Sequence, residues 1–494
     1  MFLLQQIRQI AAASPGKLAV VSNGSPLTYD RFWRLIVASR ETLAPGLPTR
    51  GLALLAVHGL LDGWLLSLAL RSLGLDTAVI AAAEQADLFE GLPVACVITL
   101  TSENWPDIGG LAGAIRLSLD PPSAQDVDDA GPPPPVPARR CGGHILLTSG
   151  TTGTPKKVLT RIGSTAADSD MFGDGVVQMF AATVRNVFNL GLWTGSGYWA
   201  PVWTWCGTGA VVMHDGGDFH RALAWPGITH SVGTPQYYAY LMDLPEGAFP
   251  YCPDMTVTVM AGALSPELAR QIRRRLAPII NINLSSTEVG GWGRVLVTGD
   301  DDLIWYWIDP GRQVQIVDEA DQVLPHGVLG RVRVALAKGA ACGYVGDPAS
   351  SAQTFQDGWF YSGDLGVLNG AGKIALYGRV ADVIYLNGDK IAAGPWERAI
   401  QDALGCEGVC LLSGRWRGTS EQLHVFIESR RVITQGELTA ALRATVRGFD
   451  QVEVHKLDAM PRTDLGKVRR IELARRLQAG ELETSLDPEV SGAV

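Results

Sequence analysis

A row of hydroxyl-bearing and glycine residues, LLTSGTTGTPKKV at residues 146–158, ends on two lysines. The row follows a short apolar run, so we expect a strand that leads into a turn whose backbone N–H groups face one concave side. Hydroxyl groups and lysine ammonium groups would add donors and positive charge to that side. This chemistry favours a phosphate group as the ligand, while composition alone also allows a plain solvent-exposed loop.

The nucleoside-triphosphatase pattern G-x-x-x-x-G-K-[ST] does not fit this stretch. Counted from Gly150, Pro155 stands where glycine is required, and Lys157 stands where a serine or threonine would bind magnesium. The stretch instead resembles the phosphate loop of the adenylate-forming superfamily, which includes acyl-CoA synthetases, nonribosomal-peptide adenylation domains and firefly luciferase. That loop reads [ST]-S-G-[ST]-[ST]-G-x-P-K, and residues 148–156 match it throughout.

The resemblance implies that this loop binds the phosphates of ATP, that Thr148 takes part in catalysis and that Thr151 is a magnesium ligand. The nucleotide-binding residues that it assigns in the loop are Thr148, Ser149, Gly150, Thr151, Thr152, Gly153, Thr154 and Lys156.

Two later segments resemble motifs of the same family and follow in the expected order. Residues 343–366, which end in YSGDLG, resemble the segment that closes on [YFT]-x-G-D. This implies that Asp364 accepts hydrogen bonds from the ribose hydroxyls of ATP, a task that suits a carboxylate with two acceptor oxygens. Residues 377–391, YGRVADVIYLNGDKI, resemble the domain-junction motif, which implies that Arg379 also contacts the nucleotide.

Two more segments complete the set. Residues 461–470, PRTDLGKVRR, resemble the C-terminal motif whose lysine, here Lys467, bridges the carboxylate and the phosphate during adenylation. Residues 284–291, LSSTEVGG, stand where the family has Y-G-x-T-E. The resemblance therefore assigns a nucleotide contact to Thr287 and a magnesium ion to Glu288.

The sequence departs from the family pattern at two positions. Leu284 stands where an aromatic ring normally stacks on adenine, so we expect ATP to bind with less specific contact to the purine. At the domain junction Ala381 replaces the usual aspartate or lysine, with Asp382 next to it. Alanine still allows the backbone rotation that alternates the domains, but a side-chain latch at that position is lost.

The chemistry that the resemblance implies explains these residue types. A carboxylate is activated by accepting AMP from ATP, and pyrophosphate leaves; an anion must therefore attack a polyanion. Cationic groups and hydrogen-bond donors at the phosphates cancel that charge, which is the role of the loop, of Lys467 and of Mg²⁺ on Glu288. A thiol then displaces AMP to give a thioester.

The acid pocket in this family lies partly in the segment that corresponds to residues 187–212, where four tryptophans are crowded together. Flat, bulky walls suit an aromatic or short acid. Asn189 stands where amino-acid-activating domains usually carry an aspartate for the α-ammonium group, which disfavours an amino acid. The residues assigned to the pocket are Phe188, Asn189, Trp193, Trp199, Gly262 and Ala263.

The sequence pattern of the segments that must position these residues predicts an α/β fold. Short apolar runs such as LALLAV and HILL alternate with helical periodicity, which is typical of strand–helix–strand units and a parallel sheet. From about residue 304 the sequence pattern changes to one typical of β-hairpins. We expect a large N-terminal domain of several subdomains, residues 1–378, that binds ATP and the acid, a small mobile α+β domain, residues 379–480, and a tail, residues 481–494.

Composition restricts the class of partner. The net charge of −9 and the lack of long basic runs disfavour nucleic acid. His58, Asp62 and Arg71 interrupt the most apolar stretch, which disfavours a membrane span. The seven cysteines lack metal or disulfide spacing, so we expect a soluble, cytoplasmic protein with reduced thiols.

The acceptor stays open between two kinds of thiol. Coenzyme A is the usual partner of stand-alone family members, and the phosphopantetheine arm of a separate acyl carrier protein is the alternative. A luciferase-like oxygenase and a catalytically silent nucleotide binder are further alternatives, the last disfavoured because Lys467 and Glu288 are both present.

Overall fold

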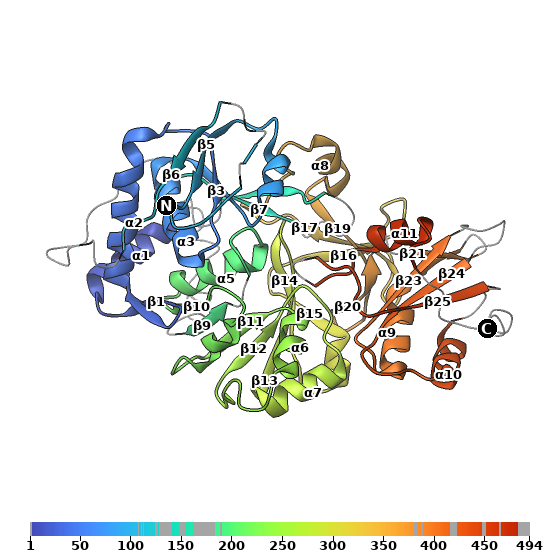
Figure 1. Cartoon of the computed structure of the whole chain (residues 1–494). Helices are drawn as coiled ribbons and strands as arrows, with labels where there is room; N and C mark the ends of the chain where they lie inside the picture. Colours follow the sequence, from blue (N-terminus) through green and yellow to red (C-terminus); the bar gives the residue numbers. More distant parts are fainter. Residues whose placement is uncertain are drawn as a thin grey trace.

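The computed structural model places a large body and a smaller C-terminal body side by side (Figure 1). The residues that it describes are 2–106, 108–109, 111, 113–123, 127, 141–148, 154–161, 183–187, 190–379, 383–386, 389–414, 422–446, 451–463 and 466–482.

The first sheet of the large body has six strands in the order β6-β5-β3-β4-β7-β8 among the described residues. Every neighbouring pair is parallel except β7 with β8. The run LALLA of β3 is buried at every position, as expected for a parallel strand covered on both faces. The strands are β3 (Leu52–Ala56), β4 (Asp76–Ile80), β5 (Val94–Thr99), β6 (Ile115–Ser118), β7 (His144–Leu147) and β8 (Lys157–Thr160).

The second sheet has 14 strands among the described residues, in the order β16-β17-β19-β20-β15-β14-β13-β12-β11-β9-β10-β1-β2, with β18 paired to β19. Its middle, from β1 through β10, β9, β11 and β12 to β13, is parallel. The strands are β1 (Leu18–Ser22), β2 (Ser25–Thr28), β9 (Val184–Val187), β10 (Ala210–Met213), β11 (His230–Gly233), β12 (Thr256–Val259), β13 (Ile279–Ser286), β14 (Gly290–Leu296), β15 (Trp305–Ile308), β16 (Val314–Val317), β17 (Gly330–Ala335), β18 (Phe355–Gln356), β19 (Trp359–Leu368) and β20 (Lys373–Arg379).

Helices cover these sheets and join them into one body. The largest core takes side chains from α1, α2, α3 and α5 together with β1, β3 and β10, so these helices lie between the two sheets. The helices of the large body are α1 (Phe2–Ala13), α2 (Tyr29–Leu43), α3 (Leu60–Leu73), α5 (Gly195–Cys206), α6 (Pro235–Asp243), α7 (Pro266–Arg275) and α8 (Pro348–Thr354), with short 3₁₀ turns η1 (Ala44–Gly46), η2 (Ala83–Phe89), η4 (Phe219–Ala224) and η5 (Asp300–Leu303).

The carboxyl ends of the parallel strands lead into capped helix starts. Thr234 directly follows β11, and its hydroxyl accepts a hydrogen bond from the Tyr237 N–H at the start of α6. Thr194 caps α5 and Ser265 caps α7 in the same manner. Hydroxyl caps satisfy backbone donors that the first helical turn leaves unpaired. Because ligands of open α/β sheets bind at this edge, the caps also place the helix starts around the expected site.

The small body has its own core. Strands β23, β24 and β25 form a sheet in which β24 is central, antiparallel to β23 and parallel to β25. Helices α9 and α10 pack on one side of this sheet, and α11 packs near Cys410 and Phe426. The elements are β21 (Val383–Leu386), β22 (Asp389–Ala392), α9 (Ala393–Leu404), β23 (Gly408–Gly414), β24 (Gln422–Glu428), α10 (Gln435–Thr445), β25 (Gln451–Leu457) and α11 (Arg470–Gln478).

The predicted α/β class is confirmed, with the β-rich part after residue 304 and a small C-terminal α+β unit. The predicted domain boundary at residue 378 falls within β20, and residues 380–382 lie outside the described residues, so the boundary stays a prediction. The seven cysteines form no disulfide. Among the described residues, no helix has the length and apolar character needed to cross a membrane.

A cluster of acidic groups around the start of α3 costs stability. Burial, together with the nearby carboxylates of Asp215 and Glu103, raises the pKa of Asp62 to about 6. A carboxyl whose pKa is higher in the folded than in the unfolded chain destabilises the fold once it ionises. The cost is therefore absent at about pH 3 and fully present above about pH 7.

Asp62→Asn should therefore raise the free energy of unfolding at pH 7.5 by on the order of 1 kcal/mol, a figure discounted for partial exposure. The gain should fade as the pH is lowered towards 4, which urea unfolding at several pH values would measure. Asp87→Asn, on an exposed carboxyl of η2, is the matched control and should change little. A gain that did not depend on pH would contradict the assigned cause.

Candidate active site

The predicted phosphate loop leaves the carboxyl end of β7 and returns to β8. The Thr148 N–H donates to the Lys156 carbonyl over 2.9 Å, and the Lys156 N–H donates to Thr148 Oγ1 over 2.9 Å. These two bonds close the base of the loop. Ser149, Gly150, Thr151, Thr152 and Gly153 lie outside the described residues, so their phosphate and magnesium contacts stay predictions.

Glu288 lies just past β13, in the turn to β14, where it meets a tyrosine from another segment. The Tyr344 hydroxyl donates to Glu288 Oε1 over 2.8 Å. Lys156 Nζ lies 4.8 Å from the centre of the Tyr344 ring. Tyr344 therefore connects the base of the phosphate loop to the carboxylate that the sequence assigned to magnesium.

The electrostatics of this pair follow from its burial. Burial raises the pKa of Glu288, while the Tyr344 hydrogen bond and the positive charges of Arg379 and Lys467 act in the opposite direction. Burial also raises the pKa of the Tyr344 hydroxyl, and the neighbouring carboxylate adds to that shift. Glu288 is a partly buried carboxylate that a cation would stabilise.

Lys467 comes from the small body and lies against the large one. The segment is a tight turn, because the Thr463 N–H donates to the Lys467 carbonyl over 2.8 Å and the Lys467 N–H donates to Thr463 Oγ1 over 3.2 Å. A Cβ atom added to Gly466, which has φ +80°, would lie 2.1 Å from Oε1 of Gln236 on α6. Only glycine fits this approach, and it brings Lys467 to the same edge of the large sheet as Glu288.

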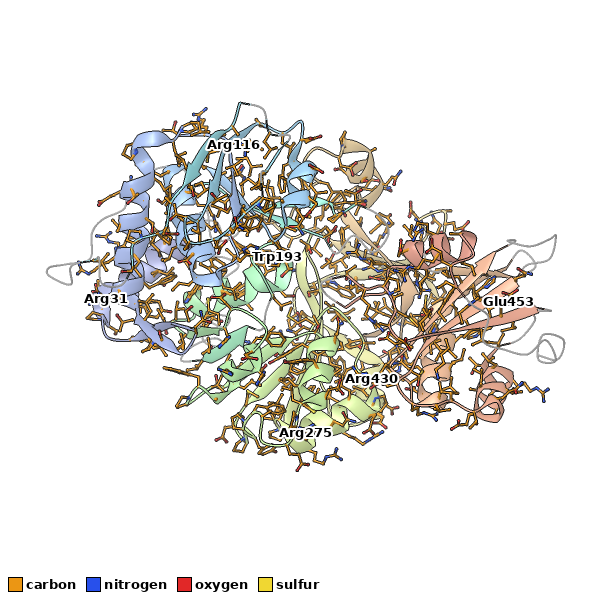
Figure 2. All side chains as sticks on the ribbon, in the orientation of Figure 1. Arg31, Arg116, Trp193, Arg275, Arg430 and Glu453 are labelled. Carbon is orange, nitrogen blue, oxygen red and sulfur yellow. The ribbon has the colours of Figure 1, made fainter. Side chains whose placement is uncertain are left out.

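A surface ion pair also joins the two bodies. Arg430 Nη1, after β24, lies 2.7 Å from Asp243 Oδ2 at the end of α6. Both side chains are more than half exposed, so the pair itself adds little stability. This ion pair and the Gly466–Gln236 contact show which faces of the two bodies meet. Figure 2 labels Arg430 on the small body, next to the large one.

Asp364 and Arg379 face each other on adjacent antiparallel strands, β19 and β20. Arg379 Nε lies 2.9 Å from Asp364 Oδ1, and Arg379 Nη1 donates to the Ser362 carbonyl over 2.6 Å. The guanidinium thus neutralises the carboxylate and fixes its direction. The charge of Arg379 also acts on Glu288, which places both predicted nucleotide contacts close to the Glu288–Tyr344 pair.

The predicted acid pocket is described in part. The Leu147 N–H at the end of β7 donates to the Trp193 carbonyl over 2.7 Å, which holds this segment beside the phosphate loop. A Cβ atom on Gly195, the first residue of α5, would lie 3.3 Å from Thr287 Oγ1. Trp199, one turn further along α5, lines a small cavity of about 20 Å³ together with Thr287 and Glu288. The tryptophan segment therefore borders the Thr287–Glu288 turn.

The structure describes some of the remaining predicted residues and not others. Gly262 and Ala263 follow β12 and are exposed, with Gly262 next to Pro235 at the start of α6. Leu284 is half-buried on β13 and pairs with Gly293, and its contact with adenine stays a prediction. Phe188, Asn189, Ala381 and Asp382 lie outside the described residues.

Two residues of the site were missed by sequence reasoning. Tyr344 lies in the recognised segment 343–366, so a tyrosine within that motif was an available signal. Arg312 lies in a turn with no motif and no periodicity; it lines the same small cavity, and its Nη2 donates to the Val289 carbonyl over 2.7 Å. Among the described residues, Arg312 Nη1 and the indole N–H of Trp199 are buried without a hydrogen-bond partner.

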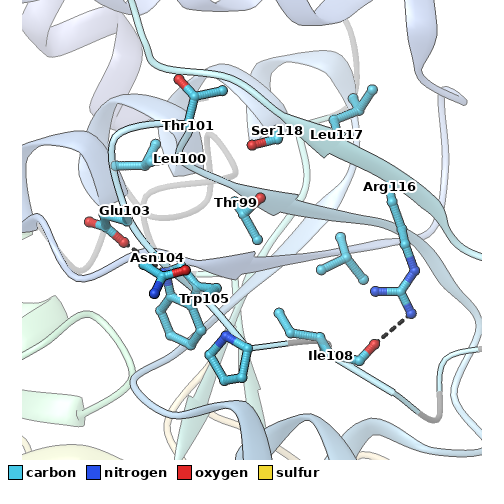
Figure 3. Close-up of a pocket in the computed structure, with 12 residues that line it drawn as sticks. Thr99, Leu100, Thr101, Glu103, Asn104, Trp105, Ile108, Arg116, Leu117 and Ser118 are labelled. Atoms are coloured by element: carbon cyan, nitrogen blue, oxygen red, sulfur yellow. Dashed lines mark hydrogen bonds between the residues drawn. The ribbon is translucent and has the colours of Figure 1, made fainter.

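A larger hollow of about 380 Å³ lies at the ends of β5 and β6 (Figure 3). Glu103, Trp105 and Arg116 line it; Trp105 Nε1 donates to Glu103 Oε2 over 2.8 Å and Arg116 donates to the Ile108 carbonyl over 2.5 Å. β3 and β4 separate it from β7. None of the predicted site residues lines it, so we place the chemistry at the Glu288–Lys467 site.

A large α/β body and a small C-terminal body, with a loop base at Thr148 and Lys156, the partly buried Glu288 and a lysine from the small body, form the arrangement expected of an adenylate-forming enzyme. The sequence model described as "AMP-binding enzyme" matches residues 51–345. The chain belongs to this family and is an AMP-forming ligase.

Similar proteins agree with that assignment. A feruloyl-CoA synthase of Amycolatopsis is 25% identical over 409 residues, covering 77% of this chain and 79% of the relative. An indoleacetate–CoA ligase of Aromatoleum aromaticum is 26% identical over 385 residues, covering 76% of this chain and 73% of the relative. The crystal structure of ATP-bound MatB from Rhodopseudomonas palustris has the same fold, with a TM-score of 0.78 and 19% identity over 97% of this chain and 99% of that one.

Proposed function

We propose that this ligase transfers AMP from ATP to an aromatic or short-chain carboxylic acid and then passes the acyl group to the thiol of coenzyme A. One observation carries the proposal most directly. The turn that carries Lys467 on the small body packs through Gly466 against Gln236 at the start of α6, and the Glu288–Tyr344 pair follows β13 of the same large sheet.

In the first half-reaction an acid oxygen attacks the α-phosphorus of ATP, and the bond to the pyrophosphate oxygen breaks. The loop between Thr148 and Lys156 would hold the phosphates, and Asp364 would accept the ribose hydroxyls. Lys467 would lie between the acid and the α-phosphate, where its charge offsets the repulsion between two anions. In the second half-reaction the thiol sulfur attacks the acyl carbon, and AMP leaves.

Magnesium fits the chemistry of Glu288. Mg²⁺ prefers oxygen ligands and is usually held by one or two carboxylates together with substrate phosphates. Burial disfavours the charged form of Glu288, and a bound cation would restore it. Thr151 is the second proposed ligand. When bound, the ion would neutralise negative charge on the phosphates.

The acid is proposed from the lining of the pocket. Trp193 and Trp199 offer flat walls. The N–H groups of Trp199 and Arg312, which have no hydrogen-bond partner in the part of the chain that the structure describes, offer donors for a polar substituent on the acid. The relatives named for feruloyl-CoA and indoleacetate act, by their names, on aromatic acids, which supports this class. We include a cytoplasmic location in the proposal.

Pyrophosphate release measured across a panel of acids tests the first half of the proposal. Aromatic and short acids should give release that depends on ATP and Mg²⁺, with AMP as the other product. Release that requires long-chain or amino acids would contradict the proposed pocket, and formation of ADP would contradict the reaction.

The acceptor is tested separately. With coenzyme A as the sole thiol, the chain should form the acyl-CoA in amounts equal to the AMP released. Thioester formation only on a phosphopantetheine-bearing carrier protein would favour the alternative acceptor. Uptake of oxygen that depends on ATP and acid would instead favour a luciferase-like oxygenase.

Asp364→Asn should raise the KM for ATP by about tenfold or more, because two hydrogen bonds to a charged acceptor are weakened. The wild type should prefer ATP to 2′,3′-dideoxy-ATP by a similar factor, and the variant should lose this preference. Asp357→Asn, on the exposed turn between β18 and β19, is the matched control. A variant that still preferred ATP as strongly as the wild type would contradict the ribose contact.

A further inference from the structure

Three metal-binding side chains converge on one face of the small domain's sheet. In the parallel pair β24–β25, His424 lies opposite Glu453 and Phe426 lies opposite His455. Residues two apart on a strand share a face, so both histidines and Glu453 project to the same side. His424 Nδ1 is 3.0 Å from His455 Nε2 and 3.7 Å from Glu453 Oε2, and the three ligand atoms lie within 4.8 Å of one another.

The two histidines are held in place by packing. The two residues are 2% and 1% exposed, and the His455 ring stacks on Phe426 with centroids 4.9 Å apart. Met460 and Leu473 belong to the same small core as Phe426, so the surroundings are largely apolar. Glu453 is a quarter exposed and connects the cluster to solvent. Figure 2 shows Glu453 on the small body, at the end of the molecule away from Trp193.

We propose that His424, Glu453 and His455 bind a divalent transition-metal ion of the Zn²⁺ class. Zinc takes imidazole nitrogen and carboxylate oxygen at about 2.0–2.2 Å, which places neighbouring ligand atoms about 3–4 Å apart. The separations of 3.0 and 3.7 Å from His424 Nδ1 fall in that range. Two histidines and one carboxylate leave a further position for water on the side of Glu453.

The donor set also separates this site from the proposed magnesium site. Mg²⁺ favours all-oxygen surroundings, whereas two imidazole nitrogens favour Zn²⁺ and its neighbours in the first transition row. Glu288 is held by Tyr344 on the large body and shares no residue with the cluster. The two sites should therefore be filled by different ions.

Metal binding here would tie β24 to β25, the strand that leads towards Lys467. Arg462, between β25 and Lys467, already pairs with Glu428 at the end of β24, with Nη2 and Oε2 2.5 Å apart. A metal that binds the folded but not the unfolded chain stabilises it by mass action. Metal binding at this site would therefore stabilise the sheet from which the Lys467 segment extends.

The test uses the full chain without an affinity tag, stripped with a chelator and dialysed against ZnCl₂. Elemental analysis should find one Zn²⁺ per chain, and the Tm should rise with added Zn²⁺ but not with added MgCl₂. Co²⁺ in place of zinc should give visible absorption bands from its coordination by nitrogen and oxygen.

Two variants make the assignment specific. Glu453→Gln keeps the shape of a partly exposed side chain and should weaken Zn²⁺ binding by at least about tenfold. Replacing a residue that only hydrogen-bonds to a metal ligand already lowers metal affinity by about that factor. His424→Asn should do the same, and its Tm without metal shows whether the chain still folds. His326→Gln, on an exposed turn of the large body, and Glu288→Gln should both leave Zn²⁺ binding unchanged.

Absence of stoichiometric Zn²⁺, or binding that survives in both Glu453→Gln and His424→Asn, would overturn the proposal. In that case the histidines form a hydrogen-bonded pair with no metal.

Discussion

Lys467→Ala should slow adenylation by at least about a hundredfold, the usual cost of losing one electrostatic contact at a reacting centre. The same variant should transfer a supplied acyl-adenylate to the thiol at close to the wild-type rate. The reason is that Lys467 offsets repulsion between the acid and the α-phosphate, and this repulsion is gone once the adenylate exists. Pyrophosphate release measures the first step, and thioester formation from synthetic adenylate measures the second.

The control for this prediction is Lys456→Ala, which removes the same charge from an exposed position on β25 of the same domain. It should leave both half-reactions unchanged. Equal loss of both half-reactions in Lys467→Ala would show that the lysine serves the fold or the domain interface, and would contradict the role given to it.

Glu288→Gln should also lower adenylation by about a hundredfold or more, and should weaken the dependence of the rate on Mg²⁺. Glutamine keeps the size of the side chain and an oxygen that can accept from Tyr344, so the change removes mainly the charge. Glu246→Gln, in an exposed loop, is the matched control and should behave as the wild type. A Glu288→Gln enzyme with unchanged Mg²⁺ dependence would contradict a role for this residue in holding the ion.

The pH dependence offers a second check on Glu288. Because burial raises its pKa, the rate should start to fall at a higher pH than for an ordinary carboxylate as the solution is acidified. Only the charged form holds a cation, so more Mg²⁺ should move this acid limb to lower pH. The limb should be absent in Glu288→Gln. If the pH at which the rate falls did not change with Mg²⁺ concentration, the fall would be due to the protonation of a group other than Glu288.

Much of the large body could be predicted because its signals are local. The runs that became β3, β7 and β13 are short and apolar, and the alternation with helices such as α3 indicates parallel strands. The strands β7 and β13 belong to two different sheets, so sheet geometry alone does not bring the segments that follow them to one site. The motif resemblance then named Thr148 and Glu288 within those segments.

The contacts between distant segments could not be predicted in the same way. Nothing in the residues around Glu288 indicates that the Tyr344 hydroxyl binds it, because 56 residues separate the two in the chain. The fit of Gly466 against Gln236 depends on how the small body lies on α6, which no local pattern encodes. His424 and His455 meet only because β24 and β25 pair in one particular register.

The central claim is that ATP binds between the two bodies with its phosphates at the Thr148–Lys156 loop. A crystal structure of the chain with Mg²⁺ and a non-hydrolysable ATP analogue tests it without knowledge of the acid. We predict phosphates on the loop, the ribose on Asp364, and Lys467 Nζ and a Glu288-bound ion at the α-phosphate. A nucleotide bound away from Asp364, or a loop left empty at saturating nucleotide, would contradict the account.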